Sequence, residues 1–183
     1  ASHVLEDLGD NVDLILDGGE TLVGVESTVL KIEADGCVLL RPGAVTREQI
    51  EKIVPFKKNT TVSTTLESPG QLESHYAPWT PLYLMEKPLA ECSQEIENLL
   101  KALQEKKQSP LRAGFLAFGA VRETPLFESV LVLSPKRDLA EAAANLFQAI
   151  RKLDKMNLDL LFAEPVPEKG IGIAIMERLK KAS

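Results

Sequence analysis

The stretch RAGFLAF, at residues 112–118, decides the fold of the larger part of this chain. Its apolar side chains follow one another without the alternation of a half-exposed strand, a pattern typical of a buried strand. Three other short apolar runs are similar, PLYLME at 81–86, SVLVL at 129–133 and DLLFAE at 159–164. We therefore expect each of the four runs to form a strand.

Helical patterns separate these strands. Apolar stripes with helical spacing cover residues 96–103 and 139–153, and Asp138 is the expected N-cap of the second helix. GIAIMERLKK, at 172–181, indicates a closing helix. Strands that alternate with helices indicate a mainly parallel sheet wound with right-handed crossovers. Residues 81–183 are thus expected to form a Rossmann-like α/β domain that folds by itself.

Residues 1–55 form a smaller unit with a different pattern. The expected elements are a helix at 2–9, a buried strand at 13–19, a strand hairpin at 26–33 and 37–43, and a helix that begins at Thr46, has Gln49 as its capping-box partner and ends before Pro55. A unit of this size buries only a modest core. We therefore expect it to need partner strands that this sequence does not contain.

Residues 56–80 connect the two units and show neither helical nor alternating periodicity. Structureless connections longer than about 15 residues are uncommon inside compact domains, and they are usually functional or true linkers. The part SPGQLESHYAP is rigid and aromatic, and His75 and Tyr76 could stack on a base and reach phosphates. The alternative is that Tyr76 and Trp79 pin the linker to a domain surface.

The composition is that of a globular protein, with 44% hydrophobic and 26% charged residues. No apolar run approaches the roughly 20 residues that cross a bilayer, so we expect a cytoplasmic protein without a membrane span. The net charge of −6 and the scattered basic residues argue against direct RNA binding. Cys37 and Cys92 form no CxxC pair, and we expect both to be small buried residues.

Two short motifs of the first unit can carry chemistry. ESTV places Ser27 and Thr28 at the start of an expected strand, where a hydroxyl can bind a carboxylate or phosphate oxygen. RPG places Arg41 at the end of the next strand, before a turn at Pro42 and Gly43, and a planar guanidinium suits a phosphate. The alternatives are ordinary strand-edge hydroxyls and a surface ion pair.

Other candidate motifs are weaker. Gly170 and Gly172 precede the last helix, where free backbone N–H groups can bind an anion. The full GxGxxG pattern is absent, which favours close packing of the helix as their role. The chain has two histidines, His3 and His75, so a metal cage or a Ser-His-Asp triad has little support, and we predict no metal-binding residue.

Taken in order, HVLEDLGDNVDLILDGG, VGVESTVL, LLRPGAVTREQIE and SPGQLESHYAPWTPLYL resemble the later part of the YrdC-type threonylcarbamoyl-AMP synthases. More specifically, they resemble the long members with an extra C-terminal domain. The closing LDLLFAEPVPEKGIGIAIMERLKKA is similar to the end of that domain. The resemblance therefore covers essentially the whole chain.

The resemblance implies a nucleotidyltransferase that converts ATP, L-threonine and bicarbonate to threonylcarbamoyl-AMP and pyrophosphate. That product serves the threonylcarbamoyladenosine modification of tRNA. By motif, the resemblance implies that Ser27 binds threonine and that Arg41, Tyr76 and His75 bind ATP, with Mg²⁺ expected beside the phosphates. It assigns no catalytic residue, and it implies that the linker closes over the nucleotide as a lid.

The resemblance also implies a division into domains. Residues 1–55 would be the C-terminal portion of a YrdC-like catalytic domain, 56–80 a linker over the active site and 81–183 the C-terminal domain. The family's earlier portion, with a basic motif and a Ser-x-Asn element, has no counterpart here. We therefore expect a fragment that is inactive alone and belongs to an active parent enzyme.

Two further expectations follow from the same likeness. Glu177 stands where relatives often show Asn, in a region of uncertain role. The transferase that passes the product to tRNA is a candidate docking partner. The alternative function is a non-catalytic α/β module that binds a ligand or a partner and acts in regulation.

Overall fold

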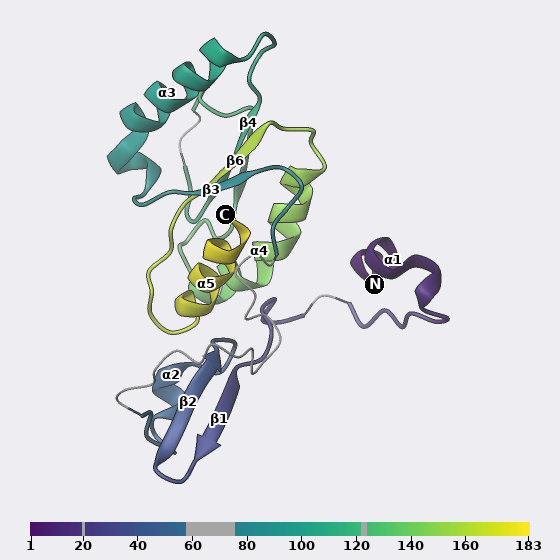
Figure 1. Cartoon of the computed structure of the whole chain (residues 1–183), viewed down its shortest axis with the longest axis vertical. Coiled ribbons are helices and arrows are strands. Elements are labelled where there is room, and N and C mark those ends of the chain that lie inside the picture. Colours follow the sequence, from purple (N-terminus) through teal and green to yellow (C-terminus); the bar gives the residue numbers. More distant parts are fainter. Residues whose placement is uncertain (20, 58–75, 122–123) are drawn as a thin grey trace.

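Two sheets organise the chain in the computed structural model, which describes residues 1–19, 21–57, 76–121 and 124–183. The C-terminal part contains a four-stranded parallel sheet, and a two-stranded antiparallel hairpin precedes it in the sequence (Figure 1). The mixed α/β class and the parallel C-terminal sheet confirm the prediction from the sequence.

The parallel sheet has the strand order β3-β6-β4-β5. Its strands are β3 (Leu82–Leu84), β4 (Ala113–Ala117), β5 (Ser129–Val132) and β6 (Leu160–Ala163). Strand β4 lies between β6 and β5, where Phe115 pairs with Phe162 on one side and Val130 on the other. Every residue of β4 is buried, as its unbroken apolar run predicts.

Helices cover both faces of this sheet (Figure 1). Helix α3 (Leu89–Lys106) covers one face, and α4 (Leu139–Asp154) and α5 (Gly172–Ala182) cover the other. Because successive strand residues point to opposite faces, Phe115 packs in the α3 core and Leu116 in the core of α4 and α5. Burying one such side chain stabilises the fold by roughly 1.5–3 kcal/mol.

The start of α4 is fixed by its expected N-cap. The Asp138 carboxylate accepts a hydrogen bond from the Glu141 N–H at 2.8 Å. The buried Ser134 hydroxyl donates to the Glu141 carboxylate and accepts from the Asp138 N–H at 2.9 Å. These bonds satisfy donors that the first turn of a helix otherwise leaves open.

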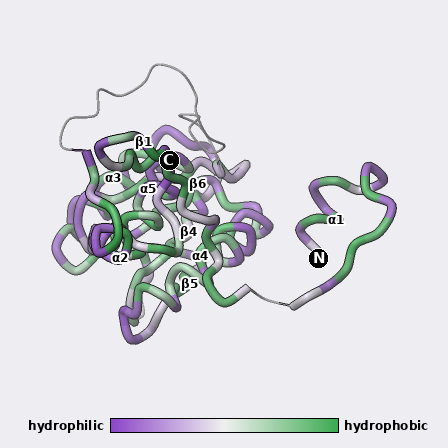
Figure 2. The backbone as a smooth tube through the Cα atoms, turned by 90° about the horizontal axis from the view of Figure 1, so that it is seen from below, coloured by the Kyte–Doolittle hydropathy of each residue, from purple (hydrophilic) through white to green (hydrophobic). Residues whose placement is uncertain are grey.

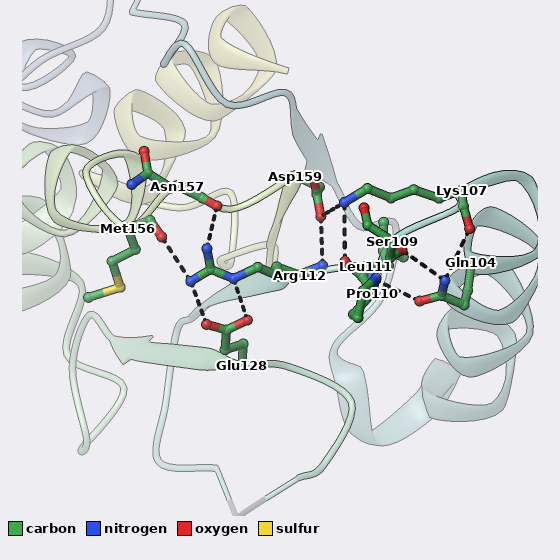
Figure 3. A network of polar contacts seen from close by, with 10 residues as sticks. All are labelled: Gln104, Lys107, Ser109, Pro110, Leu111, Arg112, Glu128, Met156, Asn157 and Asp159. Carbon is green, nitrogen blue, oxygen red and sulfur yellow. Dashed lines mark hydrogen bonds and ion pairs between the residues drawn. The ribbon is translucent and has the colours of Figure 1, made fainter.

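A network of charged side chains lies where β4, β5 and β6 begin (Figure 3). Arg112, just before β4, donates to the two carboxylate oxygens of Glu128, just before β5, at 2.8 and 2.6 Å. Asp159, just before β6, accepts from the Arg112 backbone N–H at 2.7 Å and from Lys107 Nζ at 2.5 Å. This amino-edge network therefore ties together three strands that are distant in sequence.

The N-terminal part contains α1 (Ser2–Leu8), the 3-10 helix η1 (Gly9–Asn11), β1 (Val29–Glu33), β2 (Gly36–Arg41) and α2 (Arg47–Ile50). The hairpin of β1 and β2 and the capping box of Thr46 and Gln49 confirm the predictions. Helix α2 is shorter than expected because the Ile53 N–H bonds to the Ile50 carbonyl at 2.9 Å, which tightens the chain into turns. Strand β1 begins at Val29, three residues later than expected.

The prediction of a buried strand at 13–19 is wrong. These residues form no strand, and Leu14 and Leu16 are 74% and 85% exposed. A strand needs a hydrogen-bonded neighbour, and within the described ranges no strand pairs with this segment. Figure 2 shows residues 1–19 as a stretch of mixed hydropathy that stands out from the rest of the chain.

Contacts with α4 hold this N-terminal segment. Asp7 pairs with Arg151 and Glu6 with Lys155, each at 2.6 Å, but exposed ion pairs contribute only about 0–1 kcal/mol. The closer approach is at Gly24, which has φ 65° and whose added Cβ would lie 2.4 Å from the Ala143 carbonyl oxygen. The chain therefore passes tightly over α4 before it enters the hairpin.

Two simpler expectations can be compared with the structure. Cys37 and Cys92 are both buried and unbridged, as the sequence predicts. Across the part of the chain that the structure describes, no helix has the length and apolar character to cross a membrane.

Candidate functional site

Ser27 and Arg41, two of the residues singled out by sequence, are in direct contact. Arg41 ends β2, and its Nε donates to the Ser27 carbonyl oxygen at 3.1 Å. Its Nη2 reaches the Ser27 hydroxyl at 3.3 Å. The hairpin thus brings a hydroxyl and a guanidinium together. Thr28 has a structural bond, because its hydroxyl donates to the Val45 carbonyl at 2.6 Å.

Gly43 allows this contact. A Cβ added at Gly43 would lie 2.3 Å from the Glu26 carbonyl oxygen and 2.4 Å from the Thr28 backbone nitrogen. Real Cβ atoms do not approach backbone that closely. The turn after Arg41 can therefore lie against the Ser27 segment only if residue 43 has no side chain.

Tyr76 lies on the C-terminal helices. Its ring packs on Phe147 of α4, with the centroids 5.3 Å apart, and the guanidinium carbon of Arg178 lies 5.4 Å from its centroid. Its backbone is left-handed, with φ 68°. His75, the neighbouring residue singled out by sequence, lies outside the described residues.

Trp79 behaves differently from Tyr76. Its side chain is 96% exposed, so its ring does not pin the linker to a surface. The Asp154 carboxylate instead accepts the backbone N–H groups of Trp79 and Thr80, at 3.1 and 2.8 Å. The chain is therefore held here through its backbone, at the end of α4.

Arg178 is the residue at this site that the sequence reasoning missed. It is 1% exposed, and its Nε donates to Glu26 Oε2 at 2.9 Å. Its Nη2 donates to the Pro42 carbonyl at 3.1 Å, and Nη1 pairs with Glu177. The available signal was a charged residue among the buried positions of α5, between Met176 and Leu179.

Tyr76 and Glu26 each change the pKa of the other. Burial acts to raise the pKa of the Glu26 carboxyl, but the nearby Tyr76 hydroxyl, the Glu26 backbone and the hydrogen bond from Arg178 outweigh burial and lower that pKa below 4.5. Burial and the neighbouring Glu26 carboxylate raise the pKa of the Tyr76 phenol to about 12. At neutral pH the site therefore holds an ionised Glu26 beside a protonated Tyr76.

A hollow adjoins these residues. It has a volume of about 440 Å³, and its lining includes Glu26, Tyr76, Phe147 and Gly24. A volume of that size lies in the range of small-molecule sites. Among residues 1–19, 21–57, 76–121 and 124–183 no group of three or more His, Cys, Asp or Glu side chains could hold a metal ion.

The start of α5 is not an open anion site. The Gly170 N–H donates to Glu48 Oε1 at 3.4 Å, so a carboxylate of the chain already occupies it. An added Cβ at Gly172 would lie 2.0 Å from the Pro167 carbonyl oxygen. The contact at Gly172 confirms close packing for that residue. Gly170 is not closely packed, because the nearest atom to its added Cβ, Thr46 Cγ2, lies 3.9 Å away; its φ of 53° instead favours glycine there.

Comparisons with known proteins cover the whole chain. Residues 45–183 match the family described as "Threonylcarbamoyl-AMP synthase, C-terminal domain", and residues 1–43 match the family described as "Telomere recombination". A threonylcarbamoyl-AMP synthase of Pyrococcus abyssi is 36% identical over 189 residues, and one of Bacillus subtilis is 38% identical over 187. Each comparison includes 100% of this chain, but 53% and 52% of the relatives, so the chain spans about half their length.

A solved structure shares the fold. The P. abyssi Sua5 protein complexed with L-threonine superposes with a TM-score of 0.81 at 36% identity. The superposition covers 100% of this chain and 53% of that protein. The arrangement of hairpin and parallel sheet is therefore shared with that solved structure.

We predict that Gly43→Ala separates the turn after β2 from the Ser27 segment, because the new methyl group would overlap backbone atoms. The expected loss is about 1–3 kcal/mol of the free energy of unfolding, measured by urea denaturation. Gly18→Ala is the matched control, since nothing lies within 4 Å of its added Cβ. Equal losses in the two variants would contradict the prediction.

The lowered pKa of Glu26 predicts a pH-dependent stability. Because the folded-state pKa lies below 4.5, the contribution of Glu26 is fully present above 4.5 and is lost as pH falls through that folded-state pKa. At pH 7, Glu26→Gln should therefore unfold at a lower temperature than the wild type. The difference should shrink progressively below pH 4.5, and a constant difference from pH 7 to pH 3 would refute the assignment.

Proposed function

We propose that this chain, which belongs to the threonylcarbamoyl-AMP synthase family, supplies part of a site that makes threonylcarbamoyl-AMP from ATP, L-threonine and bicarbonate. The observation that carries the proposal is the contact of Arg41 with Ser27, 3.3 Å from guanidinium to hydroxyl. A hydroxyl can bind an amino acid and a guanidinium can bind a phosphate, and both ligands take part in this reaction. The solved P. abyssi relative bound to L-threonine supports the choice of substrate.

The proposed chemistry joins two substrates on a nucleotide. The threonine amine and bicarbonate form a carbamate with loss of water, and a carbamate oxygen then attacks the α-phosphorus of ATP. The bond to the β-phosphate oxygen breaks, and pyrophosphate leaves. Negative charge gathers on the phosphate oxygens during this step, so most of the work of the protein is positioning and charge neutralisation.

Each proposed residue has a role in this scheme. Ser27 binds threonine through its hydroxyl. Arg41 binds ATP phosphates, and it exchanges its bond to the Ser27 side chain for a phosphate oxygen. The guanidinium therefore has a position beside Ser27 before ATP arrives. Mg²⁺ would enter with ATP, held mainly by the phosphate oxygens.

Tyr76 and His75 are proposed to close over the nucleotide. Tyr76 packs on Phe147 and Arg178 and lines the same hollow as Glu26, the residue before Ser27. This placement supports a lid formed by the linker, with residues 1–55 as part of the catalytic domain, 56–80 as linker and 81–183 as C-terminal domain. We also propose a cytoplasmic location, because the reaction consumes ATP and serves tRNA, and a transferase that takes up the product as partner.

The proposed function is tested by measuring pyrophosphate release from ATP with the natural full-length polypeptide. We expect release that requires both L-threonine and bicarbonate, and about a 10²-fold lower rate in Arg41→Met because a charge-neutralising group is lost. Arg47→Met is the control, since Arg47 pairs with Glu51 on α2. Absence of any threonine- and bicarbonate-dependent release would refute the proposal and favour a non-catalytic binding module.

The lid role of Tyr76 predicts weaker ATP binding in Tyr76→Ala. Loss of a stacked ring costs about 1–3 kcal/mol, which is roughly a 5- to 150-fold increase in Kd. Calorimetry with a non-hydrolysable ATP analogue measures the change, and Tyr76→Phe should bind within a few-fold of wild type if stacking dominates. Tyr83→Ala, on β3, is the control. An unchanged Kd in Tyr76→Ala removes the lid role.

A further inference from the structure

One buried guanidinium joins three segments of the candidate site. Arg178 reaches from α5 to Glu26 at 2.9 Å, to the Pro42 carbonyl at 3.1 Å and to the ring of Tyr76. Glu26 precedes Ser27, and Pro42 follows Arg41. Arg178 therefore contacts the residue before Ser27 and the residue after Arg41, and it contacts Tyr76 directly.

The charge of Arg178 is fixed in place by its surroundings. A buried guanidinium is costly unless it is paired, and here Glu26 and Glu177 pair with it on different nitrogens. Glu177 also pairs with Lys181, so its carboxylate is itself anchored on α5. The planar guanidinium can bond to both carboxylates and the Pro42 carbonyl at once. A lysine ammonium cannot present its donors in that planar arrangement.

The hydrogen bonds of Arg178 restrain Ser27 and Arg41 through the residues directly bonded to them in the chain. Holding Glu26 limits where the Ser27 hydroxyl can lie, and holding the Pro42 carbonyl limits the end of β2 that carries Arg41. Ser27 and Arg41 also bond to each other, so a shift of one segment moves the other. A misplacement of about 1 Å at a reacting group can cost about 10²-fold in rate.

We propose that Arg178 is a positioning residue through which the last helix of the C-terminal domain sets the geometry of Ser27, Arg41 and Tyr76. The assignment of what these residues bind rests on the proposed function. The positioning itself rests on the contacts of Arg178. Because those contacts reach both proposed substrate subsites, a defect at Arg178 affects threonine and ATP together.

The test compares Arg178→Met with Arg112→Met. Arg112 is also a hydrogen-bonded arginine, but it belongs to the amino-edge network of the parallel sheet. We expect Arg178→Met to raise the Kd values of L-threonine and of a non-hydrolysable ATP analogue each by about 10- to 100-fold. Arg112→Met should leave both Kd values unchanged even where it lowers the Tm as much. Arg178→Lys, which keeps the charge without the fork, should be intermediate.

A second readout does not depend on ligands. Hydrogen exchange of residues 26–43 should accelerate at least 10-fold in Arg178→Met, while exchange of the buried strand β4 stays near the wild-type rate. Unchanged exchange in residues 26–43, or Kd values that change equally in Arg112→Met, would overturn the positioning role. Faster exchange in a protein whose wild type binds neither ligand would support positioning and refute the proposed function instead.

Discussion

The ion pair between Arg178 and Glu26 is the interaction on which the described arrangement of the chain depends. It is formed by residues 152 positions apart, and it connects the last helix to the segment that leads into the hairpin. The hairpin of β1 and β2 has two strands, and a two-stranded unit is at best marginally stable in water. Its position on the larger domain therefore depends on a few close contacts, of which the buried one with Arg178 is the most protected from solvent.

Two kinds of contact fix the position of the hairpin. Gly24 and Gly43 permit backbone to lie against backbone, and such contacts fix distance without attraction of their own. The charged contacts of Arg178 supply the attraction and are directional. Together they hold Ser27 and Arg41 within hydrogen-bond distance of each other, although the parallel sheet contributes neither residue.

Much of the fold could be predicted from the sequence, because local patterns record local burial. The run 112–118 predicted the central strand, and Asp138 predicted the start of α4. The strand expected at 13–19 failed for a physical reason, since an apolar run shows only that burial is favourable and does not identify a partner. Arg178 was missed because its role comes from contacts with residues more than 100 positions away, which no local pattern encodes.

The left-handed backbone at Tyr76 has a mechanical consequence. A tyrosine at φ 68° is held in a conformation that costs of order 1 kcal/mol or more, and its seat on Phe147 and Arg178 offsets that cost. When the ring leaves its seat, the backbone can relax, so part of the lost packing energy is returned at once. Displacing the Tyr76 ring should therefore cost less free energy than its buried area alone would indicate.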